Sequence, residues 1–125
     1  MIVGIGTDIA EVDRIARALQ TYGEQFERKV FTQEEIEYCR RTPRRASERY
    51  AARFAAKEAF AKALGTGIAK GVHWRDIGVR RMPGGRPFIK LRGHAATLCA
   101  GMSIHLSLTH TETTAMATVI LERKG

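Results

Sequence analysis

The chain has 125 residues, and its 21 lysines and arginines exceed its 13 acidic residues to give a net charge of +8. This length fits one domain, residues 1–125, that can bury a core without disulfides or a structural metal. The hydrophobic content of 44% is ordinary for a soluble globular protein and excludes a membrane-embedded or disordered chain. The positive charge favours anionic partners such as nucleic acid, phosphorylated cofactors or acidic proteins.

Cysteine spacing and the N-terminus exclude further classes. Cys39 and Cys99 lie far apart and form no CxxC pair, which argues against a zinc knuckle or a thiol redox centre. The apolar N-terminal run stops at Asp8, has no basic region before it, and is too short to span a membrane. We therefore expect a cytoplasmic protein with reduced cysteines and no membrane partner.

The N-terminal segment predicts a strand. Residues 1–5 are rich in β-branched side chains and lead through Gly6 to Asp8, which we expect at the end of the strand. Asp8 could serve there as a ligand, or it could cap the helix that follows. The glycine spacing does not complete a dinucleotide-binding fingerprint, because Ile9 stands where the third glycine belongs.

Two helical segments are expected before the centre of the chain. Apolar residues recur at helical spacing over 10–22, and Gly23 ends this segment. Thr32 and Glu35 form a capping box for a second helix that runs to about Arg41. The connection that follows is basic, either as a solvated linker or as a phosphate contact. Its arginines are Arg40, Arg41, Arg44 and Arg45.

The central segment RFAAKEAFAKALGTG, residues 53–67, predicts a helix ending in a glycine loop. Alanine, leucine, lysine and glutamate all favour helix, and we expect this helix to begin near Ser47. Gly65 stands where a left-handed residue ends a helix. The many alanines would allow a neighbouring backbone to approach closely.

Helical spacing places Glu58 and Lys62 on one side of this helix and Arg53 and Lys57 on another. One interpretation is a solvated helix with a surface ion pair. The other is a single acid among cations beside a glycine loop, a composition suited to a metal ion and phosphates together.

The second half of the chain predicts antiparallel strands. The expected elements are a hairpin of 77–82 and 88–92, a short helix over 93–100, and strands over 103–109 and 114–121. Arg86 stands at the hairpin tip, and His105, Ser107 and Thr109 share the polar face of one strand. Taken alone, His105 is more typical of a strand-face hydrogen bond than of catalysis. The pattern indicates an α+β fold, a small antiparallel sheet packed with helices, whose open edges favour self-association.

Asp8 and Glu58 could together bind Mg²⁺, because this cation prefers carboxylate oxygens and completes its shell with waters and phosphates. Arg53, Lys57 and Lys62 would then neutralise phosphate oxygens beside the glycine loop. HExxH, GxSxG and GxxxxGK[ST] patterns do not occur, and the four histidines are too scattered for a zinc site. These residues suit a diphosphate-ester substrate.

Two segments carry a family resemblance, GIGTDIAEVDRI (residues 4–15) and RFAAKEAFAKALGTGI (residues 53–68). Together they resemble the two signature motifs of the 4'-phosphopantetheinyl transferases, specifically the holo-[acyl-carrier-protein] synthases. The length, the PGGRP hairpin and the closing SIHLSLTHTETTAMATVILE also fit this family. The resemblance implies Mg²⁺-dependent transfer of 4'-phosphopantetheine from coenzyme A to a serine of apo acyl carrier protein, in fatty acid biosynthesis, with release of adenosine 3',5'-bisphosphate. It also implies a homotrimer with active sites between subunits.

The resemblance implies roles for single residues. Asp8 and Glu58 match the metal-binding carboxylates and, with Lys62, are expected to be catalytic. Contacts with coenzyme A are implied for Arg53, Lys57, Lys62, Gly65, Gly67, Arg86, His105, Ser107 and Thr109. Since acyl carrier proteins are acidic, we expect the docking face to carry Arg14, Arg17, Arg28 and Lys29. The serine proton could pass to Glu58, to a metal-bound water or hydroxide, or to a carboxylate of the carrier.

Two other functions compete with this one. A nucleic-acid-binding module would use the positive charge, but the basic segments lack interleaved aromatics and any zinc-finger or RNP-like pattern. A Mg²⁺-dependent phosphohydrolase acting on a nucleotide would use the same carboxylates with water as the nucleophile.

Overall fold

The computed structural model describes residues 1–124, which form an α+β fold, as predicted. The helices are α1 (Val12–Tyr22), α2 (Glu24–Val30), α3 (Gln33–Arg40), α4 (Ala46–Leu64) and α5 (Gly93–Leu98), with 3-10 turns η1 (Pro43–Arg45) and η2 (Trp74–Asp76). The strands are β1 (Ile2–Glu11), β2 (Ile77–Arg81), β3 (Pro87–Leu91), β4 (Met102–His110) and β5 (Thr114–Arg123). Of the helices among these residues, none is long and apolar enough to cross a membrane.

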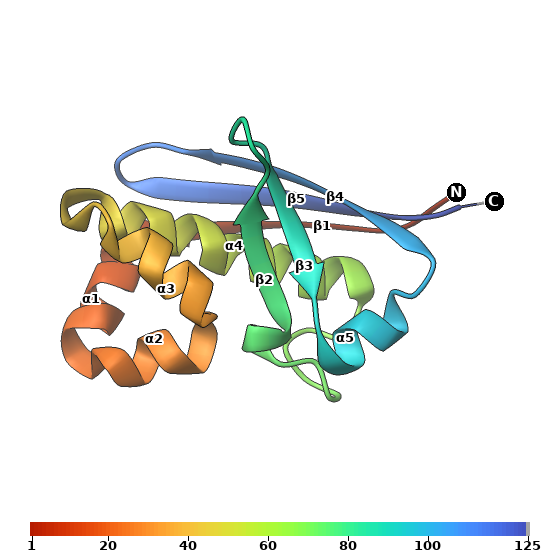
Figure 1. The fold of residues 1–125 in the computed structure, drawn as a ribbon, viewed down its shortest axis with the longest axis horizontal. Helices are drawn as coiled ribbons and strands as arrows, with labels where there is room; N and C mark the ends of the chain where they lie inside the picture. Colours follow the sequence, from red (N-terminus) through yellow and green to blue (C-terminus); the bar gives the residue numbers. More distant parts are fainter. Residues whose placement is uncertain (125) are drawn as a thin grey trace.

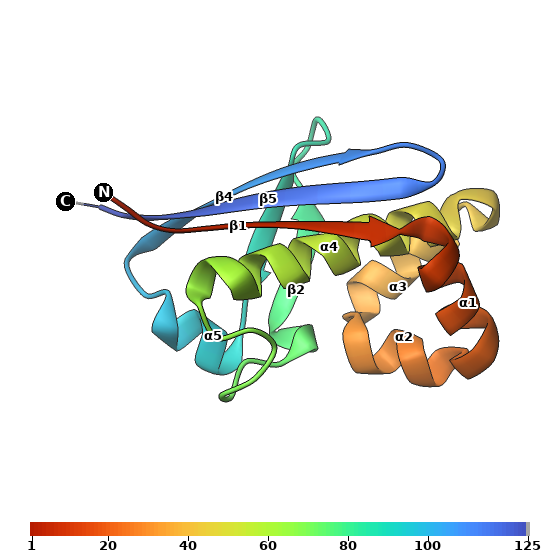
Figure 2. The same ribbon diagram turned by 180° about the vertical axis from the view of Figure 1, so that it is seen from behind.

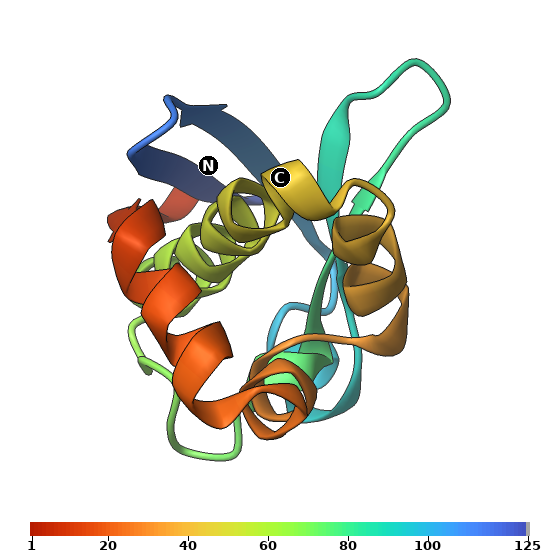
Figure 3. The ribbon, with the colours of Figure 1, turned by 90° about the vertical axis from the view of Figure 1, so that its left-hand side faces the viewer.

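Two antiparallel sheets surround the long helix α4. One has the strand order β1-β5-β4 and the other is the β2-β3 hairpin. Helix α4 runs along one face of the three-stranded sheet, and α1, α2 and α3 gather near its N-terminal half (Figures 1 and 2). Seen from that end, α1 and α3 lie on either side of α4 and the hairpin tip projects beyond them (Figure 3). Helix α4 thus contacts both sheets and helices α1 and α3.

The glycines of the N-terminal motif let β1 lie directly on α4. A Cβ atom at Gly6 would stand 2.0 Å from the carbonyl oxygen of Ala59, and one at Gly4 would stand 2.1 Å from that of Ala63. No side chain fits in this space, so the strand backbone contacts the helix backbone. The alanines of α4 allow this approach, as predicted.

Strand β1 is longer than expected. It continues to Glu11, paired with Thr114 of β5, so α1 begins at Val12 rather than at Ala10. Asp8 therefore lies inside the strand, and the N-cap position of α1 is occupied by Glu11. The alternative in which Asp8 caps this helix is wrong.

Two helix ends follow their sequence signals. The capping box of α3 is confirmed, because the Thr32 hydroxyl accepts from the Glu35 amide at 3.2 Å and Glu35 Oε1 accepts from the Thr32 amide at 2.8 Å. Helix α4 ends at Gly65 in the left-handed conformation, with φ of 87°. Its first residue, Ala46, is one position before the expected start at Ser47.

Candidate active site

Asp8 of β1 and Lys62 of α4 form an ion pair where the strand crosses the second half of the helix. Lys62 Nζ lies 2.9 Å from Asp8 Oδ1 and donates to the carbonyl oxygen of Thr7 at 3.1 Å. The Asp8 side chain is only 15% exposed, whereas that of Lys62 is 54% exposed. Because the Lys62 side chain is largely exposed, its ammonium group can turn from Asp8 towards an anionic ligand.

Glu58 lies one helical turn before Lys62 and is half-buried. Its partial burial, and then the negative charge of Asp8, raise the pKa of its carboxyl, although Lys62 opposes this shift. Asp8 thus lies close enough for its charge to disfavour ionisation of Glu58. The structure brings Asp8, Glu58 and Lys62 together, as the sequence predicted.

This pair of carboxylates could hold a divalent cation. Two oxygen donors suffice for Mg²⁺, which retains waters and takes up substrate phosphates. Within residues 1–124, no cluster of three or more His, Cys, Asp or Glu side chains suits a metal. A cation here would therefore keep most of its coordination positions open, and its charge would offset the repulsion by Asp8, which adds to the effect of burial on the pKa of Glu58.

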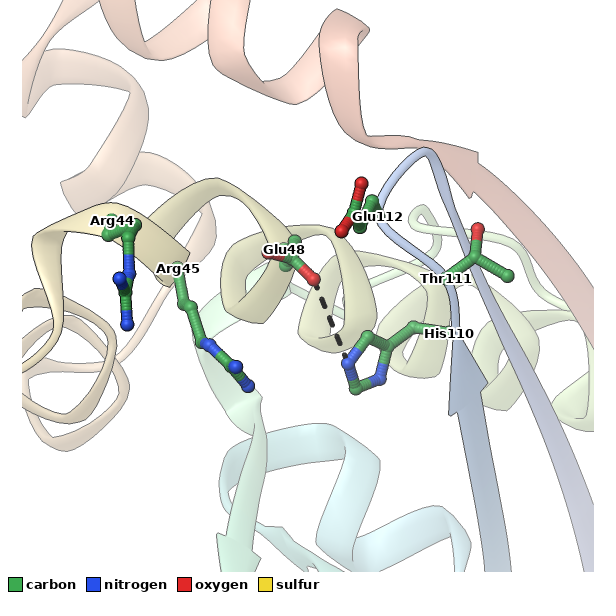
Figure 4. Close-up of a pocket in the computed structure, with 6 residues that line it drawn as sticks. All are labelled: Arg44, Arg45, Glu48, His110, Thr111 and Glu112. Atoms are coloured by element: carbon green, nitrogen blue, oxygen red, sulfur yellow. Dashed lines mark ion pairs between the residues drawn. The ribbon is translucent and has the colours of Figure 1, made fainter.

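A second region, rich in arginine, lies around the N-terminal half of α4. One cavity of about 690 Å³ opens between the start of α4 and the β4-β5 turn (Figure 4). An adjoining cavity of about 300 Å³ shares Arg45, Glu48 and His110 with it. In Figure 4 a dashed line joins Glu48 and His110, whose Oε1 and Nε2 atoms lie 3.9 Å apart.

Several cations of this region were not assigned to a site from the sequence. Arg53 was predicted and lines the smaller cavity, Arg44 and Arg45 were noted as a possible phosphate contact, and Arg49, Arg81 and His110 were missed. Arg44 and Arg45 belong to the basic connection noted in the sequence. The strand period could have identified His110, because it shares its side of β4 with the inward-facing Leu108.

Lys57 requires a correction. Its side chain is fully buried, with Nζ 2.7 Å from Glu35 Oε1 and 3.0 Å from the carbonyl oxygen of Trp74. The ammonium also donates to the carbonyl oxygen of Ile77, so its three hydrogens all have partners inside the protein. This geometry does not support the expected phosphate contact, and we assign Lys57 to the core.

The polar face of β4 lies on the outside of the three-stranded sheet. The apolar residues of this strand pack on the core, so His105, Ser107 and Thr109 lie on the face turned away from α4. His105 Nε2 contacts Glu122 Oε1 at 2.9 Å on that outer face. Within one chain these three residues do not meet Asp8, and an approach to the same bound nucleotide is not supported.

The glycine loop and the hairpin tip were predicted to contact coenzyme A. Gly65 and Gly67 both have positive φ, and a Cβ on either would meet nothing within 4 Å, so the turn after Lys62 is open. Arg86 is exposed at the hairpin tip and lines neither arginine cavity. Arg81, which begins the turn of the same hairpin, lines the smaller one.

The cations expected to bind the carrier lie on two consecutive helices, α1 and α2. Arg14 and Arg17 are exposed on α1, and Arg14 borders a groove of about 170 Å³ that includes Phe54. Arg28 pairs with Glu24 at 3.5 Å. Lys29 instead lines a different cavity, next to the loop of residues 68–75.

The chain is similar to known proteins over most of its length. Residues 4–119 match the model of the 4'-phosphopantetheinyl transferase superfamily. The chain is 50% identical to a holo-[acyl-carrier-protein] synthase of Koribacter versatilis, over 98% of this chain and 99% of the relative.

Two solved structures are similar over almost their full length. A holo-(acyl-carrier-protein) synthase from Bacillus anthracis, in complex with CoA (3',5'-ADP), has a TM-score of 0.85 and 38% identity, covering 99% of each chain. The enzyme from Neisseria meningitidis has a TM-score of 0.87 and 38% identity, covering 98% of this chain and 100% of its own. This chain therefore belongs to the 4'-phosphopantetheinyl transferase superfamily and, within it, to the holo-[acyl-carrier-protein] synthases.

Proposed function

We propose that this chain transfers the 4'-phosphopantetheine arm of coenzyme A to a serine hydroxyl of an apo acyl carrier protein and releases adenosine 3',5'-bisphosphate. The observation that carries this proposal is the meeting of Asp8 with Lys62 at 2.9 Å beside Glu58, on the helix whose first half lines the arginine-rich cavities. Carboxylates and a mobile lysine suit the diphosphate, and the arginines suit the nucleotide phosphates.

Asp8 and Glu58 would hold the Mg²⁺ ion. When bound, the ion supplies positive charge against the diphosphate and the leaving bisphosphate. Lys62 would turn from Asp8 towards the equatorial oxygens of the transferred group.

The arginine-rich region would hold the nucleotide. Guanidinium groups bind phosphate through two parallel hydrogen bonds, and Arg45, Arg49 and Arg53 present such groups around the smaller cavity. Arg53 precedes Glu58 by five residues of one helix, a rise of roughly 7–8 Å. Since Arg53 and Glu58 lie on different sides of α4, coenzyme A held at the arginines would reach the carboxylates around the helix or between subunits of the proposed trimer. The CoA-bound Bacillus anthracis relative supports this choice of ligand.

The outer face of the three-stranded sheet supports self-association. Val3, Ile5, Ile9 and Met116 are 42%, 65%, 63% and 39% exposed, and Ile9 pairs with Met116 in the sheet. An apolar surface of this kind marks an interface. We propose a homotrimer in which this face is covered and a neighbouring chain completes each site. An Ile9→Glu variant should then elute as a monomer.

The proposed carrier docks on α1, where Arg14 and Arg17 would meet its acidic surface. The product is the carrier with its prosthetic arm, and we propose a cytoplasmic role in fatty acid biosynthesis. The expected direction of transfer follows from the chemistry, since the diphosphate bond of coenzyme A is broken and a phosphodiester to serine is formed.

Mass spectrometry of coenzyme A and Mg²⁺ incubated with the protein, with and without apo carrier, tests the proposal. We expect a mass gain on the serine of the apo carrier. A carrier in which this serine is replaced by alanine should show no mass gain. Hydrolysis of coenzyme A without an acceptor would identify a phosphohydrolase instead. Submicromolar binding of DNA or RNA without transfer would identify a nucleic-acid-binding module.

A further inference from the structure

One tyrosine gathers four arginines from three parts of the fold. The guanidinium carbons of Arg53 and Arg49 lie 4.2 and 4.5 Å from the centre of the Tyr38 ring, and those of Arg81 and Arg41 lie 5.8 and 5.9 Å from it. Tyr38 lies on α3, the first two arginines on α4, and Arg81 on β2. An aromatic face attracts cations at such distances.

These four cations have no acidic partner. Within the described part of the chain, no carboxylate oxygen comes within 4.0 Å of a nitrogen of any of them. Two neighbouring arginines differ in this respect, since Arg40 pairs with Glu27 and Arg80 pairs with Glu34 at 2.9 Å. The four guanidinium groups around Tyr38 therefore make no direct ion pair, although Glu48 lines one adjoining cavity and Glu34 and Glu37 line the other.

Arg53 is the most constrained member of the cluster. It is only 2% exposed, its Nε atom has no hydrogen-bond partner, and its Nη1 makes only a long 3.4 Å contact with the carbonyl oxygen of Arg49. A buried cation without an acid is costly unless another group stabilises it. The ring of Tyr38 contacts this guanidinium. Because no carboxylate pairs with Arg53, its charge can still attract an anion.

The cluster borders open space. Tyr38, Arg53 and Arg81 line the cavity of about 300 Å³ already described, and the same three residues line a second cavity of about 310 Å³. The Tyr38 hydroxyl makes no hydrogen bond to residues 1–124. The backbone carbonyl oxygen of Tyr38 accepts from Arg49 Nη1 at 3.1 Å, and the ring face, rather than the hydroxyl, is the part of its side chain that contacts these cations.

We propose that Tyr38 is a positioning residue for phosphate recognition, whose ring holds Arg49 and Arg53 together so that they bind the phosphomonoester of a nucleoside bisphosphate. The ring attracts both guanidinium groups and reduces the cost of placing like charges side by side. Loss of the ring would let the arginines separate, and the preference for a nucleotide with a second phosphate would fall. This inference rests on the proposed function, since it specifies how the same site selects its substrate.

Isothermal titration with adenosine 3',5'-bisphosphate and with adenosine 5'-monophosphate tests this role. Tyr38→Leu is expected to weaken binding of the bisphosphate about tenfold and binding of the monophosphate by less than about threefold. Tyr38→Phe, which keeps the ring, should bind both within about twofold of the wild type. In steady-state assays Tyr38→Leu should raise the KM for coenzyme A and leave kcat and the KM for the carrier unchanged.

Each outcome has one meaning. Equal bisphosphate affinity in Tyr38→Leu and the wild type overturns the inference, and so does an equal loss for both nucleotides, which would indicate general disruption. If circular dichroism finds Tyr38→Leu unfolded, Tyr38→Met, of similar volume and without a ring, takes its place with the same expectations. A wild-type protein that neither binds the bisphosphate nor modifies the carrier would instead refute the proposed function.

Discussion

Lys57 and Glu35 form an ion pair inside the protein, with Nζ and Oε1 2.7 Å apart and neither side chain exposed. The other oxygen of Glu35 accepts from the amide of Val79 at 2.8 Å, so the pair joins α3, α4 and β2. Because Lys57 precedes Glu58, this contact fixes the rotation of α4 about its own axis where the candidate site lies.

Replacing Lys57 tests whether it belongs to the core. Lys57→Met should lower the free energy of unfolding by about 3–5 kcal/mol, because Glu35 would remain buried without its cation. Urea denaturation measures this change. The double variant Lys57→Met/Glu35→Leu should not recover fully, since Glu35 also caps α3. If Lys57→Met had normal stability but reduced affinity for coenzyme A, Lys57 would contact phosphate after all, as expected from the sequence.

Glu58→Gln should separate stability from activity. Partial burial and Asp8 raise the pKa of Glu58 above its value in the unfolded chain, so its contribution to stability is present below the unfolded pKa and is lost as the pH rises through the folded pKa. At neutral pH the metal-free variant should therefore melt roughly 1–3 °C higher than the wild type. This difference should vanish in acid, where both side chains are neutral.

The same variant should lose at least about 100-fold in transfer activity, since the proposed ligand of the ion is altered. Added Mg²⁺ should raise the melting temperature of the wild type and leave that of Glu58→Gln unchanged. Differential scanning calorimetry with and without Mg²⁺ provides both measurements. Full Mg²⁺-dependent turnover by folded Glu58→Gln would remove Glu58 from the metal site.

Gly6→Ala should push β1 away from α4, since its Cβ would stand 2.0 Å from the carbonyl oxygen of Ala59. We expect a loss of roughly 2–4 kcal/mol in stability and a larger KM for Mg²⁺, because Asp8 moves with the strand. Gly78→Ala is a matched control in β2, where the nearest atoms to a Cβ lie at 3.4 and 3.7 Å. Equal effects of the two substitutions would contradict the close contact.

Arg14→Glu should weaken binding of the acidic carrier about tenfold at low ionic strength. The effect should fade as salt rises, because exposed charges are screened within a few ångströms at molar salt. Surface plasmon resonance at low and high salt follows both changes, and Lys90→Glu, an exposed reversal of the same charge on β3, is the control. An unchanged dissociation constant at low salt would exclude Arg14 from the interface.

Local signals in the sequence predicted most elements, although helix α2 was not among the expected ones. The capping box of Thr32 and Glu35, the glycine end of α4 and the β2-β3 hairpin all depend on residues close together in the chain. The encounter of Asp8 with Glu58 was also predicted, but from the family motifs, because no local pattern tells how β1 lies on α4.

The orientation of α4 could not be read from its sequence. Its alanines cover most of its surface, so the sequence placed Lys57 and Lys62 on different sides of the helix without telling which side is buried. Lys57 is buried against Glu35, whereas Lys62 pairs with Asp8. The alternation in β4 did predict that Ile104, Leu106 and Leu108 meet the core and that His105 lies on the polar face. The sequence could not bring Arg81 to Tyr38, because tertiary packing alone joins them.

The glycines of β1 have a consequence for ion preference. At Gly4 and Gly6 the backbone of β1 contacts the backbone of α4 directly. The distance between Asp8 and Glu58 therefore cannot be adjusted by a change in the volume of a side chain between strand and helix. If these carboxylates hold the cation as proposed, the ionic radius that they accept is set by backbone geometry. Adaptation to a larger or smaller ion would then have to come from the length of the acidic side chains themselves, one methylene at a time.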